Sequence, residues 1–212
     1  MKREWQAQLQ EQLVVELGSG YANSTVRPSG TGCINDTWEI AARGCDSLFM
    51  KTGPATALAM YEQECAGLYA LRQCEAIRVP RVHFRALVGD QAVLVMEFIA
   101  LSTPRAQHDH AIADALSALH QMPGPQFGLA ADNFIGRTPQ INLWHDNWWT
   151  FWCECRMQTT MAAGPAAWDA PCIGGKIELA QLIECIPMAF GQHAATTSIA
   201  ARRPVEWQSC GG

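Results

Sequence analysis

Ser29-Gly30-Thr31-Gly32-Cys33-Ile34-Asn35-Asp36 stands between two runs of residues that predict short strands, and the next predicted strand ends in Phe49-Met50-Lys51. Small residues in such a turn let backbone N–H groups approach a phosphate group closely. A Gly-x-Gly turn on its own is more often an ordinary hairpin. The loop therefore predicts a phosphate site only in combination with the charged residues that come after it in the chain.

Lys51 and Glu64 follow this loop in an order that suits a nucleotide site. Glu64 lies in a predicted helix over residues 57–73, where apolar residues recur at helical spacing. In phosphoryl transfer a strand lysine contacts the phosphates, and a carboxylate from the following helix aligns the lysine. Two solvated surface charges are the alternative for any such pair chosen blindly. The position of the pair behind the glycine-bearing loop favours the nucleotide site.

The elements around the loop predict a small lobe with a sheet. Trp5, Leu9 and Leu13 fall at helical spacing and predict a helix over residues 4–17, which stops at Gly18. Alternating residues and turn signals predict strands over 25–28, 37–41, 48–51, 81–88 and 91–99. Gly89-Asp90 is a hairpin turn between the last two strands. This order is that of a nucleotide-binding lobe with a five-stranded antiparallel sheet.

The spacing of apolar residues in the second half of the chain predicts helices. Residues 112–119 carry a helical stripe, and a helix rich in tryptophan is expected from about 144 to 157. The expected fold class is therefore α+β, with a sheet lobe over 1–100 and a partial helical lobe over 101–193. The last strand leads into a hinge at which the backbone groups of Glu97 and Ile99 would meet adenine. An ordinary apolar core strand explains these residues equally well.

Composition excludes several classes of function. The 212 residues carry a net charge of −5 and a pI near 5.6, which give no basic surface for a nucleic acid. No apolar run approaches membrane-spanning length, so we expect no membrane association and a cytoplasmic location. The nine cysteines form no Cys-x-x-Cys pair and are expected to be free thiols rather than zinc ligands.

Several stretches of the chain resemble the fructosamine kinase (ketosamine 3-kinase) family. The glycine loop and Lys51 are shared with aminoglycoside and choline kinases, whereas Asp132-Asn133-Phe134-Ile135-Gly136-Arg137-Thr138-Pro139-Gln140 looks like this family in particular. Further matching residues are Gly32 to Glu39, Met60 to Leu68, Val79 to Val82, Asn142, Trp144, Trp148, Phe151 and Arg156. The resemblance covers residues 1–157 and resumes over 173–193.

The resemblance implies a bilobal, protein-kinase-like fold and ATP-dependent phosphorylation of the sugar on glycated amines. ATP with magnesium would be the cofactor, and the ketosamine of a glycated amine or protein would be the substrate. The expected nucleotide-binding residues are Gly30, Gly32, Cys33, Asn35, Lys51, Glu64, Glu97 and Ile99. Cys33 is either a passive small residue of the loop or an exposed thiol able to form a regulatory disulfide.

The stretch Ala200 to Gln208 can be read one nucleotide out of register as a different peptide. With suitable codons, the shifted reading is Leu-His-Gly-Asp-Leu-Trp-Ser-Gly-Asn, a kinase-type catalytic loop. Trp207 has the single codon TGG, so the codon that starts at its second base begins with GG and encodes glycine. A frameshift is therefore inferred, with residues 158–172 and 194–212 expected to be out of register and to lack a coherent core.

The resemblance assigns catalysis to an aspartate of His-Gly-Asp, and metal binding to a following asparagine and a later aspartate. None of these is present in frame, so no catalytic residue and no metal ligand is assigned, and this chain is expected to be inactive itself. Three alternatives stand beside this one. The chain is a non-catalytic nucleotide-binding module, another small-molecule kinase of aminoglycoside or choline kinase type, or a product whose uncovered apolar helices prevent stable folding.

Overall fold

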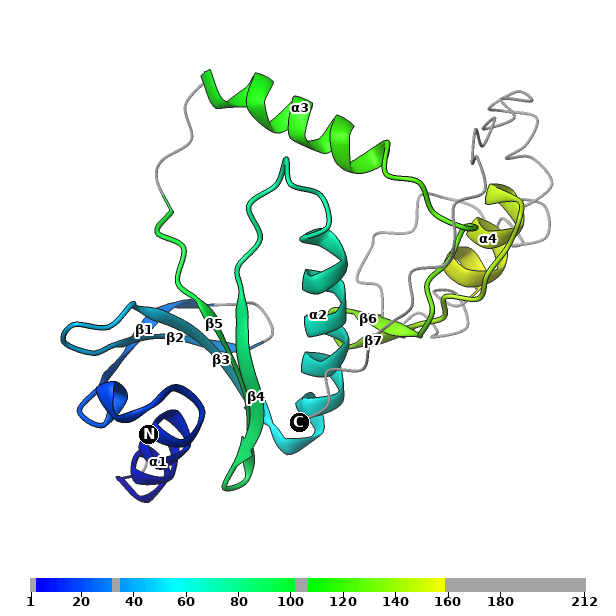
Figure 1. Ribbon diagram of the computed structural model, residues 1–212. Helices are drawn as coiled ribbons and strands as arrows, with labels where there is room; N and C mark the ends of the chain where they lie inside the picture. The colour runs from blue at the N-terminus through cyan, green and yellow to red at the C-terminus, as the bar shows by residue number, and fades with distance from the viewer. Residues whose placement is uncertain (1–2, 32–34, 102–106, 159–212) are drawn as a thin grey trace, which may run out of the picture. The chain divides into compact units, whose positions relative to one another are not determined.

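The computed structural model describes residues 3–31, 35–101 and 107–158 of the chain (Figure 1). Two compact units divide between Met122 and Pro123. Gly32 and Cys33 of the expected nucleotide loop lie outside the described residues. The residues beyond Gln158, which include the segments expected to be out of register, also lie outside them.

The first unit is built on a five-stranded antiparallel sheet with the strand order β1-β2-β3-β5-β4. The strands are β1 (Thr25–Thr31), β2 (Asp36–Ala41), β3 (Leu48–Pro54), β4 (Val82–Val88) and β5 (Gln91–Glu97). The expected five-stranded antiparallel sheet is confirmed. Two strands are longer than expected, since β1 continues to Thr31 and β3 to Pro54, whereas β5 ends at Glu97 rather than at Ile99.

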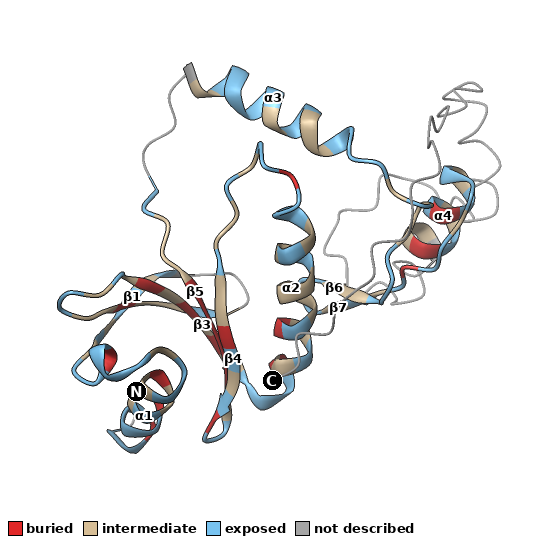
Figure 2. Ribbon diagram, viewed as in Figure 1, coloured by how far each residue is buried: buried red, intermediate tan, exposed pale blue. Residues whose placement is uncertain are grey.

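One helix covers each face of the sheet (Figures 1 and 2). Helix α1 (Arg3–Leu17) packs with Val93 and Val95 of β5, and helix α2 (Leu58–Leu71) packs with Leu94 and Met96 of the same strand. The alternation follows from the strand's two-residue period. Because both faces are covered, β5 reads as a continuous apolar run with no polar alternation.

Strand β3 divides its residues between the same two faces. Leu48 and Met50 are fully buried in the core under α1, while Phe49 packs on the α2 side. By the same alternation Lys51 and Gly53 belong to the α2 side. The strand thus carries its lysine to the face that α2 covers, in the middle of the sheet.

Helix α1 is held to the sheet by apolar packing and one buried hydrogen bond. Leu9 and Leu13, one helical turn apart, are almost fully buried. The Trp5 indole N–H donates to the Val88 carbonyl over 2.8 Å, which joins the start of α1 to the end of β4. Two short 3₁₀ turns, η1 (Ser19–Tyr21) and η2 (Ala55–Ala57), lead from α1 toward β1 and from β3 into α2.

The remaining elements are helix α3 (Gln107–His120) and, in the second unit, a hairpin, a short helix and a π-helical turn. These are β6 (Asn133–Ile135), β7 (Thr138–Gln140), α4 (Trp148–Trp152) and η3 (Cys153–Gln158). The expectation that the tryptophan-rich helix begins at 144 is wrong. His145 pairs in extended form with Phe127, and the Asn147 side chain then caps α4 by accepting from the N–H groups of Trp149 and Thr150.

None of the helices within the described residues is long and apolar enough to cross a membrane.

Glu97 joins the end of β5 to the residues that lead into β4. The Arg78 guanidinium donates to its carboxylate over 2.7 Å, and the Arg81 backbone N–H donates over 3.2 Å. The Glu97 backbone N–H donates in turn to the Arg81 carbonyl over 2.8 Å. The hydrogen bond from Arg78, followed by that from Arg81, lowers the pKa of the Glu97 carboxyl below its ordinary value.

Replacing Leu13 by alanine tests whether α1 is part of one cooperative core. Leu13 is fully buried, so Leu13→Ala should lower the free energy of unfolding by about 2–4 kcal/mol. Val15, on the same helix, is 78% exposed, and Val15→Ala should change it by less than about 0.5 kcal/mol. Urea unfolding of the full chain followed by circular dichroism measures both. Equal effects, or the absence of a cooperative transition, would contradict this packing.

A second prediction concerns the pH dependence of stability at Glu97. Because the folded pKa is lowered, the stabilisation is complete above the ordinary value of 4.5 and is lost as the pH falls through the folded pKa. Glu97→Gln should therefore cost less than about 1 kcal/mol at neutral pH, since the pair is solvent-accessible, and nothing in acid. Urea unfolding over this pH range is the measurement, with the exposed Glu75→Gln as the control. A cost that persists unchanged in acid is the contrary result.

Candidate nucleotide site

Lys51 and Glu64 meet between the central strand and α2. Lys51 on β3 is paired with Thr37 of β2 and Leu94 of β5, and its ammonium donates to the Glu64 carboxylate. Their side chains are 26% and 27% exposed, so both remain accessible from solvent. The structure thus brings together the two charged residues that the sequence singles out.

The placement of this ion pair follows from the packing of α2. Tyr61, one turn before Glu64, is fully buried against the sheet together with Ala92 and Leu94 of β5. Residues three apart share a helix face, so docking Tyr61 brings Glu64 to the same side. A partly exposed ion pair itself contributes only about 0–1 kcal/mol. The apolar contacts hold the helix, and the carboxylate orients the lysine.

The ends of the candidate phosphate loop, Ser29 to Asp36, lie on β1 and β2. Gly30 has a φ of 112°, which side-chain-bearing residues rarely adopt, and the pairing of β1 with β2 shifts register between Pro28 and Thr31. The Thr37 hydroxyl donates to the Gly30 carbonyl over 2.9 Å. Thr37 lies opposite Lys51 in the sheet. The loop therefore ends on β2, the neighbour of the strand that carries the lysine, and starts on β1, one strand further out.

Gly53 lies two residues beyond Lys51 and is crowded on its α2 side. A Cβ atom at this position would stand 3.1 Å from the Tyr61 hydroxyl oxygen, 3.1 Å from the Ala57 Cβ and 3.4 Å from the Asn35 Oδ1. A larger residue here would require these groups to move by a few tenths of an ångström. The site therefore includes Gly53 and Tyr61, which sequence reasoning missed. The spacing of Tyr61 from Glu64 was the available signal for Tyr61.

The two hinge residues differ in what their groups already bind. The backbone N–H and the carboxylate of Glu97 are both used inside the protein, at Arg81 and Arg78. The next N–H, of Phe98, donates to the Ser47 carbonyl over 3.3 Å. Ile99 makes no such backbone hydrogen bond among the described residues. Of the two, Ile99 is the one with backbone groups available to a base.

These groups together suit an anionic ligand. Lys51 supplies a positive charge, Glu64 aligns it, and Thr37, the strand neighbour of Lys51, donates to the Gly30 carbonyl. No three histidine, cysteine, aspartate or glutamate side chains gather into a possible metal site within residues 3–31, 35–101 and 107–158. The magnesium expected with ATP accordingly has no assigned ligand there.

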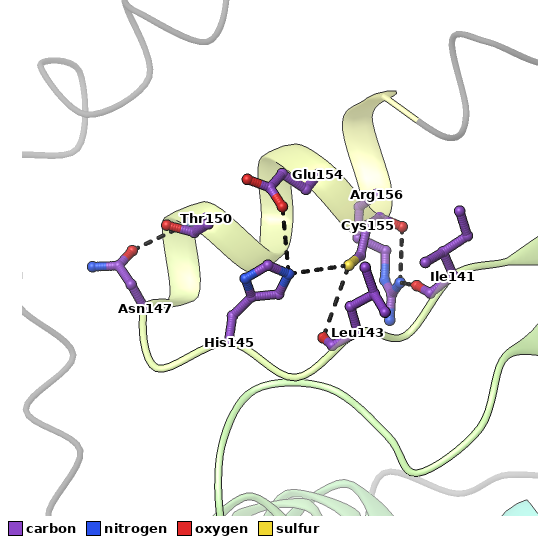
Figure 3. A network of polar contacts seen from close by, with 8 residues as sticks. All are labelled: Ile141, Leu143, His145, Asn147, Thr150, Glu154, Cys155 and Arg156. Atoms are coloured by element: carbon purple, nitrogen blue, oxygen red, sulfur yellow. Dashed lines mark hydrogen bonds and ion pairs between the residues drawn. The ribbon is translucent and has the colours of Figure 1, made fainter.

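The second unit contains a thiol, an imidazole and a carboxylate in contact (Figure 3). The Cys155 Sγ lies 3.7 Å from the His145 Nε2, and the Glu154 carboxylate lies 3.6 Å from the same nitrogen. In a catalytic triad the acid orients the other ring nitrogen. Cys155 is also only 1% exposed. This cluster therefore packs η3 against the preceding segment and does not form a nucleophile.

The family-like segment around Asp132 has a structural role in this unit. Asn142 is 2% exposed, its backbone N–H donates to the Asp132 carboxylate over 2.8 Å, and its side-chain amide donates to the Ala131 carbonyl. Arg156 donates over 2.8 Å to the Ile141 carbonyl (Figure 3). It donates over the same distance to the Asn142 Oδ1. These bonds join the residues flanking the β6–β7 hairpin to η3.

Trp148 packs within the second unit. Its ring centroid lies 5.5 Å from that of Phe127, 5.7 Å from that of Phe151 and 5.6 Å from that of Trp152. Such offset and edge-on aromatic contacts are typical of packing.

The curated proteins that this chain resembles are named as ketoamine kinases or ribulosamine 3-kinases. A "Probable ketoamine kinase" of Synechocystis is 33% identical over 161 residues, which are 74% of this chain and 53% of that protein. The chloroplastic "Protein-ribulosamine 3-kinase" of Arabidopsis thaliana is 34% identical over 131 residues, 60% of this chain and 40% of that protein. The chain spans about half the length of the curated relatives it matches.

A solved structure shows the same fold. The crystal structure of a "Putative fructosamine-3-kinase" from Haemophilus somnus matches 89% of this chain and 62% of its own with a TM-score of 0.72 and 21% identity. At this identity the likeness shows the fold alone. The expected protein-kinase-like α+β fold is confirmed.

The model of the fructosamine kinase family matches residues 4–199, which is nearly the whole chain. This protein therefore belongs to the fructosamine kinase family.

Proposed function

We propose that residues 1–100 form the ATP-binding lobe of a kinase that phosphorylates ketosamines, the fructosamine or ribulosamine adducts of glycated amines. The observation that carries the proposal is the contact of Lys51 with Glu64 beside the glycine-bearing loop. The names of the relatives supply the substrate class. A glycated small amine or protein in the cytoplasm is the proposed partner.

Phosphoryl transfer depends on positioning and charge balance, since the protein contributes little covalent chemistry. In the proposed site Lys51 contacts the phosphates and Glu64 keeps its ammonium directed toward them. The glycine-bearing loop, which contains Gly32 and Cys33 in sequence and leads to Asn35, is proposed to supply backbone N–H groups. Ile99 contributes hinge backbone groups for the adenine, whereas Glu97 is proposed to stabilise the hinge through Arg78.

The proposal separates nucleotide binding from turnover. No His-Gly-Asp string stands in frame, and the inferred frameshift would restore one from the stretch Ala200 to Gln208 with suitable codons. Without its aspartate, no group orients the sugar hydroxyl for attack on the phosphate. We therefore propose that the 212-residue chain binds ATP and does not transfer its phosphate, and that restoring the reading frame restores transfer.

Binding of ATP to the full chain tests the site. Lys51→Ala should weaken ATP binding about 10- to 100-fold, because it removes a charged partner of the phosphates. Isothermal titration calorimetry measures the affinity, with Arg72→Ala as a control that removes an exposed positive charge at the end of α2. Added magnesium should change the affinity of the chain little. Equal affinities of the original chain and Lys51→Ala would refute the assignment.

Phosphate transfer tests the substrate class and the frameshift together. Labelled ATP is incubated with synthetic fructosyl-lysine or ribulosyl-lysine and either the present chain or a frame-restored version. The expected result is no transfer by the present chain and transfer by the restored one, abolished by Lys51→Ala. Turnover by the present chain would mean that the catalytic residues are misplaced. Failure of the restored version on both compounds would exclude the proposed substrates.

A further inference from the structure

Thr37 of β2 stands opposite an irregularity at the end of β1. Between the pairings of Pro28 and Thr31, two residues of β1 face Thr37 alone, which is the arrangement of a β-bulge. Gly30, the second of these two residues, has a φ of 112°. Bulges interrupt regular pairing and are common beside functional sites. This bulge forms the first two residues of the candidate phosphate loop.

The Thr37 hydroxyl joins the bulge to β2. It donates to the Gly30 carbonyl over 2.9 Å. Threonine suits this position for two reasons: its β-branched side chain favours a strand, and its short hydroxyl reaches a carbonyl of the neighbouring strand. The side chain therefore supplies a link across the strands at the point where the regular register is interrupted.

The same residue is the strand neighbour of Lys51. Thr37 and Lys51 are paired between β2 and β3, and paired residues project to the same face with Cβ atoms about 4.5–5.5 Å apart. Trp38, the next residue, packs in the core under α1, so alternation puts Thr37 on the α2 face, where Lys51 meets Glu64. One threonine thus connects Gly30 with the lysine of the candidate site.

We infer that Thr37 is a positioning residue of the ATP site, whose hydroxyl keeps the Gly30 end of the candidate phosphate loop in register with Lys51. This inference rests on the proposed function. The hydrogen bond is present without nucleotide, so it arranges the site in advance and lowers the cost of ordering it on binding. In this role the Thr37 hydroxyl donates to Gly30 and not to the phosphates.

Thr37→Val tests the hydroxyl because it keeps the β-branched shape. In the full chain this variant should bind ATP roughly 3- to 10-fold more weakly, the effect of one lost hydrogen bond. Thr37→Ser keeps a hydroxyl and should restore the affinity to within about twofold of the original. Isothermal titration calorimetry measures the affinities, and urea unfolding checks that each variant folds. Thr37→Ala removes the same hydroxyl and takes the place of the valine variant if that variant does not fold.

Thr25→Val is the matched control. The Thr25 hydroxyl donates to the Ala41 carbonyl over 3.3 Å, at the other end of the same strand pair. Both valine variants should lower the free energy of unfolding to a similar extent, whereas only Thr37→Val should weaken ATP binding. Equal weakening by the two valine variants would show that both hydroxyls act only on the strand pair, and this result would overturn the inference.

Lys51→Ala separates the inference from the proposed function. If Lys51→Ala weakens ATP binding while Thr37→Val binds like the original chain, the inference fails and the proposed function stands. The inference also fails if Thr37→Ser binds as weakly as Thr37→Val. If the original chain and Lys51→Ala bind alike, the proposed function fails and takes the inference with it.

Discussion

The contact between β3 and α2 is the constraint on which the candidate site depends. β3 is an inner strand of the sheet, so the position of Lys51 is set by pairing on both sides, at Thr37 and Leu94. The helix is set by the burial of Tyr61 in the apolar cluster on the same face. The ion pair with Glu64 is too weak to hold these elements itself. The packing of β3 and α2 places the Lys51 ammonium and the Glu64 carboxylate together at a solvent-accessible edge of the apolar core.

Glycine at position 53 shows how this packing also shapes the site. The strand must pass close to α2 at the point where the Tyr61 hydroxyl, the Ala57 side chain and Asn35 converge. A Cβ at this point would make these neighbours shift by a few tenths of an ångström. Within the described residues, the buried Tyr61 oxygen at this point has no hydrogen-bond partner.

The first lobe could be predicted well because its signals are local. The alternation in β3 and the helical spacing of Trp5, Leu9 and Leu13 are set by which face is buried. The hairpin of β6 and β7 has only three residues in each strand, too few for a period to show, and sequence reasoning missed it. The expected start of the tryptophan-rich helix was too early in the sequence. The extended pairing of His145 with Phe127 delays the helix, and this contact is non-local, so local spacing does not show it. Tyr61 was missed because its role depends on a neighbour from another element.

A reactive ATP analogue gives the most direct test of the central claim, that nucleotide phosphates bind at Lys51. An acyl phosphate of ATP transfers its acyl group to a lysine amine held beside the phosphates, and peptide mass spectrometry then locates the label. The chain has three lysines, Lys2, Lys51 and Lys176, so two serve as internal controls. The account predicts labelling concentrated on Lys51 and suppressed by excess ATP. Equal labelling of all three, or labelling of Lys51 that ATP does not suppress, would contradict it.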